Sequence, residues 1–229
     1  MQPRARVRPI AADDWEAITA LEARAYRPLG LSEERAVLQS KARSSPATCF
    51  ALDAAGRSPA GYLLALPYPE SAAPSLTARE ERVFRSRNLH LHDLVVAEEL
   101  RGRGYGRLLL RRLAGQARRA GYERISLVAV GGSRGFWAAN GFTARDGEVA
   151  GYGPGAVYMS MALPRPGDHG RHVLAGHPRG AGREEAGRNG IVRNGTVRNE
   201  PGRGERGRSD IGRNENSRDL TRRDESGMS

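Results

Sequence analysis

The sequence is poor in cysteine, in lysine and in long apolar runs. Cys49 is the only cysteine and Lys41 the only lysine among 229 residues, so an intrachain disulfide framework is excluded. No apolar run reaches the roughly 18 residues that a membrane-spanning helix needs, and the N-terminus lacks the charged-then-apolar pattern of a secretory signal. These absences predict a cytoplasmic protein that does not act at a membrane.

Aromatic residues are missing from the last part of the chain. Residues 164–229 contain no Phe, Tyr or Trp and consist mainly of Arg, Gly, Asn, Glu and Asp. Such a composition buries too little apolar surface to offset the entropy of ordering the chain. The sequence therefore predicts one globular domain over residues 1–163 and a disordered tail over residues 164–229. Arg/Gly-rich segments can bind RNA, but this one has no aromatic rings for base stacking and many acids, so nucleic acid is not an expected partner.

A positive charge excess is present along the whole chain, whose formal net charge is +11. Residues 1–163 contain 23 basic and 16 acidic side chains, and residues 164–229 contain 14 and 10. The excess therefore does not come from the tail alone. A basic surface suits the phosphates of a cofactor and those of nucleic acid equally well.

Residues 89–110 are the stretch around which the chain is organised. Residues 90–96 have the length and composition of a buried strand, and residues 101–106 form a glycine-rich turn. Leucines at helical spacing follow the turn. A strand, a glycine-rich turn and a helix N-terminus together make a cradle for an anion, because unpaired N–H groups and the helix dipole point outward there.

The motif at this turn is R-x-x-G-x-G, with Arg101, Gly104 and Gly106 in the fixed places. Together with the segment F-W-A-A-N-G-F over residues 136–142, it resembles the GNAT superfamily of acyl-CoA-dependent N-acetyltransferases. The resemblance covers residues 4–163. It implies a mixed α/β fold with the order βααβββαβαββ, acetyl-CoA as co-substrate and no metal.

The resemblance also assigns the cofactor-binding residues. In the family, the pantetheine arm pairs with the backbone of the central strand and the diphosphate lies on the glycine-rich turn. The assigned strand residues are Leu94, Val95 and Val96. The assigned turn residues are Arg101, Gly102, Arg103, Gly104, Tyr105, Gly106 and Arg107.

Two histidines and an aspartate precede this strand segment. His90 and His92 are two residues apart, so regular alternation places both on one face of the strand, and imidazole suits the deprotonation of an amine. This His-x-His resembles arylalkylamine (serotonin-type) N-acetyltransferases, in which two histidines relay the amine proton. Asp93 is the second base candidate; it points to the opposite face unless the strand bulges. The alternative is that the histidines are only packed or hydrogen-bonded.

One position departs from the family pattern. Trp137 stands where the family usually has the tyrosine that protonates the leaving thiolate, and an indole N–H donates a hydrogen bond without serving as an acid. Water, Tyr152, Tyr158 or Ser133 are the alternatives, while Trp137 can pack beside the thioester.

The predicted function is the direct transfer of an acetyl group to a primary amine, most simply that of a small molecule. Two alternatives stay open: a catalytically weak acyl-CoA-binding sensor or partner module, and a protein N-terminal acetyltransferase of the ribosomal-protein type. The oligomeric state is open, with a homodimer as one option. The order of elements also predicts a second helix starting at Ser32 and a long loop over residues 67–87 leading into the histidine strand.

Overall fold

A seven-stranded mixed sheet forms the centre of the protein, in a computed structural model that describes residues 5–147 and 149–164. The strand order across the sheet is β1-β2-β3-β4-β5-β7-β6. The strands are β1 (Arg6–Pro9), β2 (Phe50–Ala54), β3 (Arg57–Pro67), β4 (Asn88–Val96), β5 (Arg124–Ala129), β6 (Thr143–Ala144) and β7 (Val157–Ala162). With the helices, they give the predicted order βααβββαβαββ, which confirms the mixed α/β fold class.

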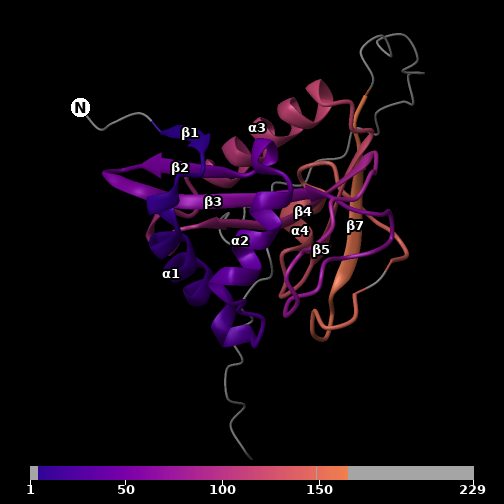
Figure 1. The fold of residues 1–229 in the computed structure, drawn as a ribbon, viewed down its shortest axis with the longest axis horizontal. Coiled ribbons are helices and arrows are strands. Elements are labelled where there is room, and N and C mark those ends of the chain that lie inside the picture. Colours follow the sequence, from indigo (N-terminus) through magenta and orange to yellow (C-terminus); the bar gives the residue numbers. More distant parts are fainter. Residues whose placement is uncertain (1–4, 148, 165–229) are drawn as a thin grey trace, which may run out of the picture. The chain divides into compact units, whose positions relative to one another are not determined.

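Four α-helices accompany the sheet: α1 (Trp15–Tyr26), α2 (Arg35–Ser44), α3 (Tyr105–Arg119) and α4 (Arg134–Ala138). In Figure 1, α1 and α2 lie together over the β3–β4 part of the sheet, and α3 lies apart from them. The buried side of α3 carries leucine and alanine at helical spacing, which is the pattern that predicted this helix. No helix in the described part of the chain has the length and apolar character to cross a bilayer.

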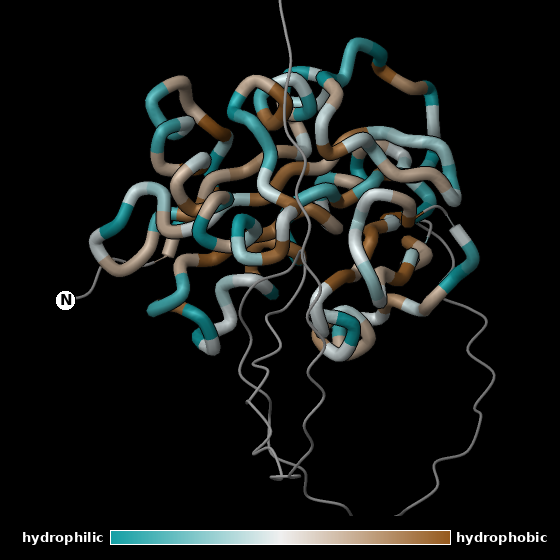
Figure 2. The backbone as a smooth tube through the Cα atoms, turned by 90° about the horizontal axis from the view of Figure 1, so that it is seen from below, coloured by the Kyte–Doolittle hydropathy of each residue, from teal (hydrophilic) through white to brown (hydrophobic). Residues whose placement is uncertain are grey.

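The core follows the central strands. All nine residues of β4 are buried, and so are the last nine of β3. Figure 2 shows hydrophobic backbone segments toward the interior and hydrophilic ones on the outer loops and helix faces. Residues 88–92 of β4 alternate polar and apolar side chains although all of them are buried, and residues 94–96 are wholly apolar.

The start of the second helix differs from the prediction. Helix α2 begins at Arg35, three residues after Ser32. The preceding residues are held by Glu22 of α1, which accepts hydrogen bonds from Ser32 Oγ at 2.7 Å and from the Glu33 N–H at 2.8 Å. Tertiary contacts therefore keep Ser32 and Glu33 outside the helix, and they turn the Glu33 side chain inward.

The predicted tail lies almost entirely outside the described residues. The last backbone hydrogen bond of the described part joins the Leu163 N–H to the Glu123 carbonyl at 2.8 Å. The domain boundary at residue 163 and the disorder of residues 164–229 stay predictions.

Candidate active site

Strands β4 and β5 separate shortly after they begin. Their parallel pairing covers only Asn88–His90 of β4 and Arg124–Ser126 of β5. Farther along, β4 still pairs with β3 up to Val96, and β5 pairs with β7. The edges of β4 and β5 that face each other therefore leave backbone groups of Leu94, Val95 and Val96 without a strand partner on that side, among the described residues. Such a split can receive an extended, amide-containing ligand.

The glycine-rich turn follows β4 after a short 3₁₀ helix, Glu98–Leu100. Gly102 and Gly104 have φ angles of 77° and 80°, which a residue with a Cβ rarely adopts. Gly104 is the N-cap of α3, so the first helical N–H groups, starting at Tyr105, lack intrahelical acceptors. Arg103 and Arg107 are exposed beside them. This arrangement of amides and guanidinium groups fits a diphosphate.

Arg101 differs from its exposed neighbours because its side chain is only 26% exposed. Its Nε is buried and has no hydrogen-bond partner within the described residues. Burial lowers the pKa of the guanidinium, while the charge of Glu98 acts in the opposite direction. A buried N–H without an acceptor is costly, so this group is suited to a ligand oxygen.

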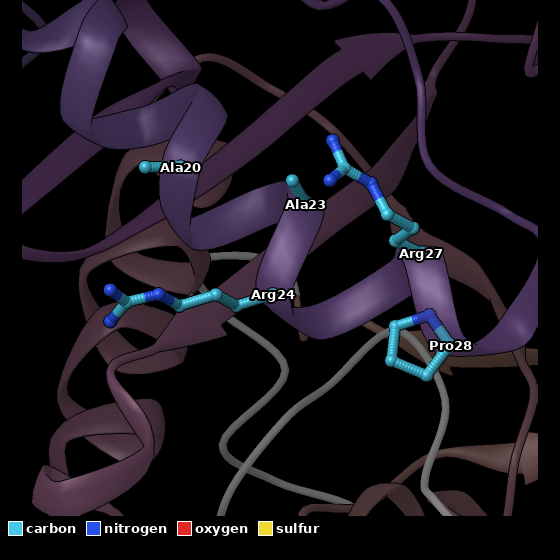
Figure 3. Close-up of a pocket in the computed structure, with 5 residues that line it drawn as sticks. All are labelled: Ala20, Ala23, Arg24, Arg27 and Pro28. Atoms are coloured by element: carbon cyan, nitrogen blue, oxygen red, sulfur yellow. The ribbon is translucent and has the colours of Figure 1, made fainter.

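A cavity of about 80 Å³ lies where β4 ends. It is lined by residues of α1, the end of β4 and the following turn: Leu21, Arg24, Ala25, Val95, Val96, Ala97, Glu98, Glu99 and Arg101. A larger and shallower pocket of about 570 Å³ lies on the outer side of α1 and includes Arg24 as well (Figure 3). Arg24 and Arg27 project in different directions there, so they do not form a clamp for one anion. The cavity at the strand end is the one that adjoins the split.

A β-bulge shapes β4 at His92. Leu64 of β3 pairs with Asp93, and the next residue, Ala65, pairs with Leu91, which leaves His92 as the extra residue. The bulge interrupts the alternation of side chains. Asp93 therefore joins His92 in one buried cluster with Glu33, in which one ligand atom of each residue lies within 4.8 Å of the others. Strict alternation would have separated them.

Glu33 connects this cluster to a buried lysine. Glu33 Oε1 lies 2.7 Å from His92 Nε2, and Glu33 Oε2 accepts a hydrogen bond from Lys41 Nζ at 2.6 Å. Asp93 Oδ2 accepts a hydrogen bond from the Tyr62 hydroxyl at 3.1 Å. Two carboxylates and an imidazole are possible metal ligands, but the Lys41 ammonium already supplies the cation that compensates Glu33.

His90 lies beside the point where β4 and β5 separate. Its Nδ1 is 3.1 Å from Ser126 Oγ of β5, and Asn88 Nδ2 donates to the same oxygen at 2.8 Å. The rings of His90 and His92 are 6.4 Å apart. His90 thus contacts Ser126 of β5, and His92 contacts Glu33.

Trp137 is buried in α4, with 1% of its surface exposed. Its ring packs against Phe136 and Phe142, with centroid distances of 5.1 and 5.2 Å. The indole Nε1 is buried and has no hydrogen-bond partner in the part of the chain that the structure describes. Trp137 is thus a core residue that carries one unused donor.

The other candidate acids already have hydrogen-bond partners. The Tyr158 hydroxyl accepts a hydrogen bond from the Ser71 N–H at 3.0 Å, and the Tyr152 hydroxyl donates to the Pro74 carbonyl at 2.7 Å. The Ser133 hydroxyl donates to the Val130 carbonyl at 3.0 Å. The two tyrosines therefore fasten the long loop before β4 and are not directed at a reacting group by these bonds.

Sequence reasoning missed Glu33 and Lys41. Glu33 was expected in the first turn of a helix, where acids are common on the surface. Its distance of 59 positions from His92 along the chain gave no sign of their contact. The one available signal was Lys41 itself, the only lysine in an otherwise arginine-based sequence.

Comparison with known proteins agrees with this fold. Residues 15–142, more than half of the chain, match the model of the acetyltransferase (GNAT) family. The chain belongs to this family and is an acyltransferase of the GNAT type. A search of the curated proteins finds no match.

Among solved structures, the chain is similar to the GphF GNAT-like decarboxylase in complex with isobutyryl-CoA, with 26% identity and a TM-score of 0.59 over 69% of this chain and 100% of that one. The ribosomal-protein-S18-alanine N-acetyltransferase of Escherichia coli is 15% identical, with a TM-score of 0.53 over 72% and 98% of the two chains. The PaiA N-acetyltransferase of Thermoplasma acidophilum, in complex with coenzyme A, is 13% identical, with a TM-score of 0.52 over 70% and 99%.

Proposed function

We propose that the protein transfers an acetyl group from acetyl-CoA to a primary amine by direct attack in a ternary complex. The observation that carries this proposal is the split between β4 and β5, which ends at the helix N-terminus of α3. A pantetheine arm fits the unpaired backbone of Leu94, Val95 and Val96. The diphosphate fits the amides that follow Gly104, together with Arg103 and Arg107.

His92 is the base in this proposal, with His90 and Asp93 beside it. The neutral amine attacks the thioester carbon, its proton passes to the imidazole directly or through water, and the C–S bond breaks. Backbone N–H groups at the split stabilise the oxyanion. The thiolate leaves without a tyrosine at position 137, and it takes its proton from water.

The test is the release of free CoA from acetyl-CoA in the presence of a panel of small primary amines and N-terminal peptides. We expect turnover with at least one amine and a loss of about 100-fold or more in kcat for His92→Ala, within the roughly 10²- to 10⁴-fold that general base catalysis contributes. Calorimetry should show the variant binding acetyl-CoA as the native protein does. Binding without turnover on any amine would instead favour an acyl-CoA sensor.

A second function is favoured by Trp137. Decarboxylation of a carboxyacyl-CoA breaks a C–C bond and leaves the thioester intact, so that no group needs to protonate a leaving thiolate. The electrons of the broken bond form an enolate, carbon dioxide leaves, and the α-carbon takes up a proton. The GphF GNAT-like decarboxylase, at 26% identity, is also among the compared structures. Conversion of malonyl-CoA to acetyl-CoA, followed by mass spectrometry, distinguishes this reaction from amine acetylation.

A further inference from the structure

Two buried ionisable residues outside β4, Glu33 and Lys41, form a chain of contacts that ends at His92. Glu33 and Lys41 have side chains that are 0% and 1% exposed, and His92 is 0% exposed in its side chain. Glu33 precedes α2, Lys41 is in α2 and His92 is at the bulge of β4, so the chain brings them together from two separate segments. Burial of three ionisable groups is expensive, and it is tolerated only where they compensate one another.

The contacts determine which imidazole nitrogen carries hydrogen. Lys41 Nζ donates to Glu33 Oε2 at 2.6 Å, and this pairing keeps Glu33 in its ionised form, which can only accept hydrogen bonds. Glu33 Oε1 lies 2.7 Å from His92 Nε2. His92 Nε2 must therefore be the donor, and the lone pair of the neutral ring is on Nδ1.

Other ionisable groups surround this pair. Glu22 of α1 accepts the Glu33 N–H at 2.8 Å, and the Tyr62 hydroxyl of β3 donates to Asp93 of β4 at 3.1 Å. The ring of His90, also in β4, lies 6.4 Å from that of His92.

We propose that Glu33 is the positioning residue of His92: it fixes the tautomer with the lone pair on Nδ1, and Lys41 keeps Glu33 ionised for that purpose. Glu33 touches neither cofactor nor amine in this scheme and acts only through the imidazole. The inference rests on the proposed function for its kinetic consequences, but the tautomer itself can be observed without any turnover.

The kinetic test uses two single variants of the full chain with opposite changes of charge. Glu33→Gln removes a negative charge beside His92, so the acid limb of the kcat/KM profile should move to lower pH by about 1 unit. Lys41→Met removes a positive charge, so the same limb should move to higher pH. Glu34→Gln and Arg43→Met alter exposed neighbours in the same way and should leave the profile unchanged.

Glu33→Gln should also exchange the tautomer. Lys41 still requires an acceptor, so the amide oxygen turns to the ammonium and the amide N–H turns to His92 Nε2. We expect kcat to fall by about 10- to 100-fold, part of the contribution of a general base. In Glu33→Gln/Lys41→Met the amide is free to turn back, and part of this loss should be recovered.

The readout that does not depend on activity is the tautomer of His92, measured by long-range ¹H–¹⁵N NMR of the imidazole nitrogens. The native protein should show Nε2–H, and Glu33→Gln should show Nδ1–H, in samples whose melting curves prove them folded. Nδ1–H in the native protein, or acid limbs that do not move apart in the two single variants, would overturn the inference. If the native protein shows Nε2–H but transfers no acetyl group, the proposed function fails while the tautomer assignment stands.

Discussion

Trp137 shows how one residue separates binding from chemistry. The position of its ring between Phe136 and Phe142 is that of a core residue, and the indole contributes no proton. An acyl-CoA can be held by strand and helix backbone whatever stands at position 137. Only the departure of the thiolate depends on an acid there.

Trp137→Tyr should therefore raise the kcat of amine acetylation, by about 10-fold, because a phenol can protonate the thiolate. The smaller ring leaves a cavity and should lower the free energy of unfolding by about 1–2 kcal/mol. Steady-state kinetics and chemical denaturation measure the two effects. Trp137→Phe is the control, since it makes a similar cavity without a hydroxyl. Equal kcat values for the two variants would contradict a role for an acid at this position.

The residues proposed for the site differ in how far the sequence points to them. The turn glycines, His90, His92 and Asp93 were predicted from one short stretch and its family resemblance, and their roles stay predictions. Glu33 and Lys41 could not be found in this way, because tertiary contacts with α1 and β4 decide that they face inward. Lys41 is among the largest fully buried side chains, in conflict with the usual exposure of lysine.

At the scale of elements, a cluster around Arg8 joins β1, α1 and β2. Arg8 donates to both carboxylate oxygens of Asp14 at 2.6 and 2.8 Å, and to Asp53 at 2.8 and 3.0 Å. The hydrogen bonds from Arg8 are the main reason that the pKa of Asp14 is lowered from its usual value of 3.8. Asp14 also accepts the Ala11 N–H at 2.6 Å, which fixes the start of the first helical segment.

A carboxylate whose pKa is lower in the folded than in the unfolded state stabilises the fold above the unfolded value, and this stabilisation is lost as the pH falls through the folded value. Asp14→Asn should lower the free energy of unfolding at pH 7 by about 1–3 kcal/mol. The deficit should shrink as the pH falls below about 4. Urea denaturation at several pH values measures it, with the exposed Asp13→Asn as control. A deficit of the same size at pH 7 and pH 3 would exclude this account.

Helix boundaries were predicted less well than helix existence. The order of all eleven strands and α-helices followed from the family resemblance. The start of α2 did not, because Glu22 supplies acceptors that no local pattern reveals. The separation of β4 and β5 after Ser126 likewise has no local pattern in the sequence.

At the scale of the whole molecule, the backbone hydrogen bonds of the described fold end just before the predicted tail begins. The hydrogen bond from the Leu163 N–H to the Glu123 carbonyl is the last backbone contact of that fold. Removal of residues 165–229 should leave acetyl-CoA binding unchanged and shift Tm by less than about 2 °C, equivalent to less than about 1 kcal/mol. Calorimetry and a thermal melt of the truncated and full chains measure both. A drop of more than about 5 °C would show that the tail supports the domain.

Because His92 is an extra residue in β4, the side chains alternate in one register before it and in the opposite register after it. Before it, even-numbered positions share a side; after it, the odd-numbered Asp93 takes their place in the cluster. A deletion of one residue here would rotate the second half of the strand about its axis and exchange the side chains on its two faces. A relative whose alignment has a gap at this position would therefore place different side chains on each face of the strand, even where its sequence is nearly identical.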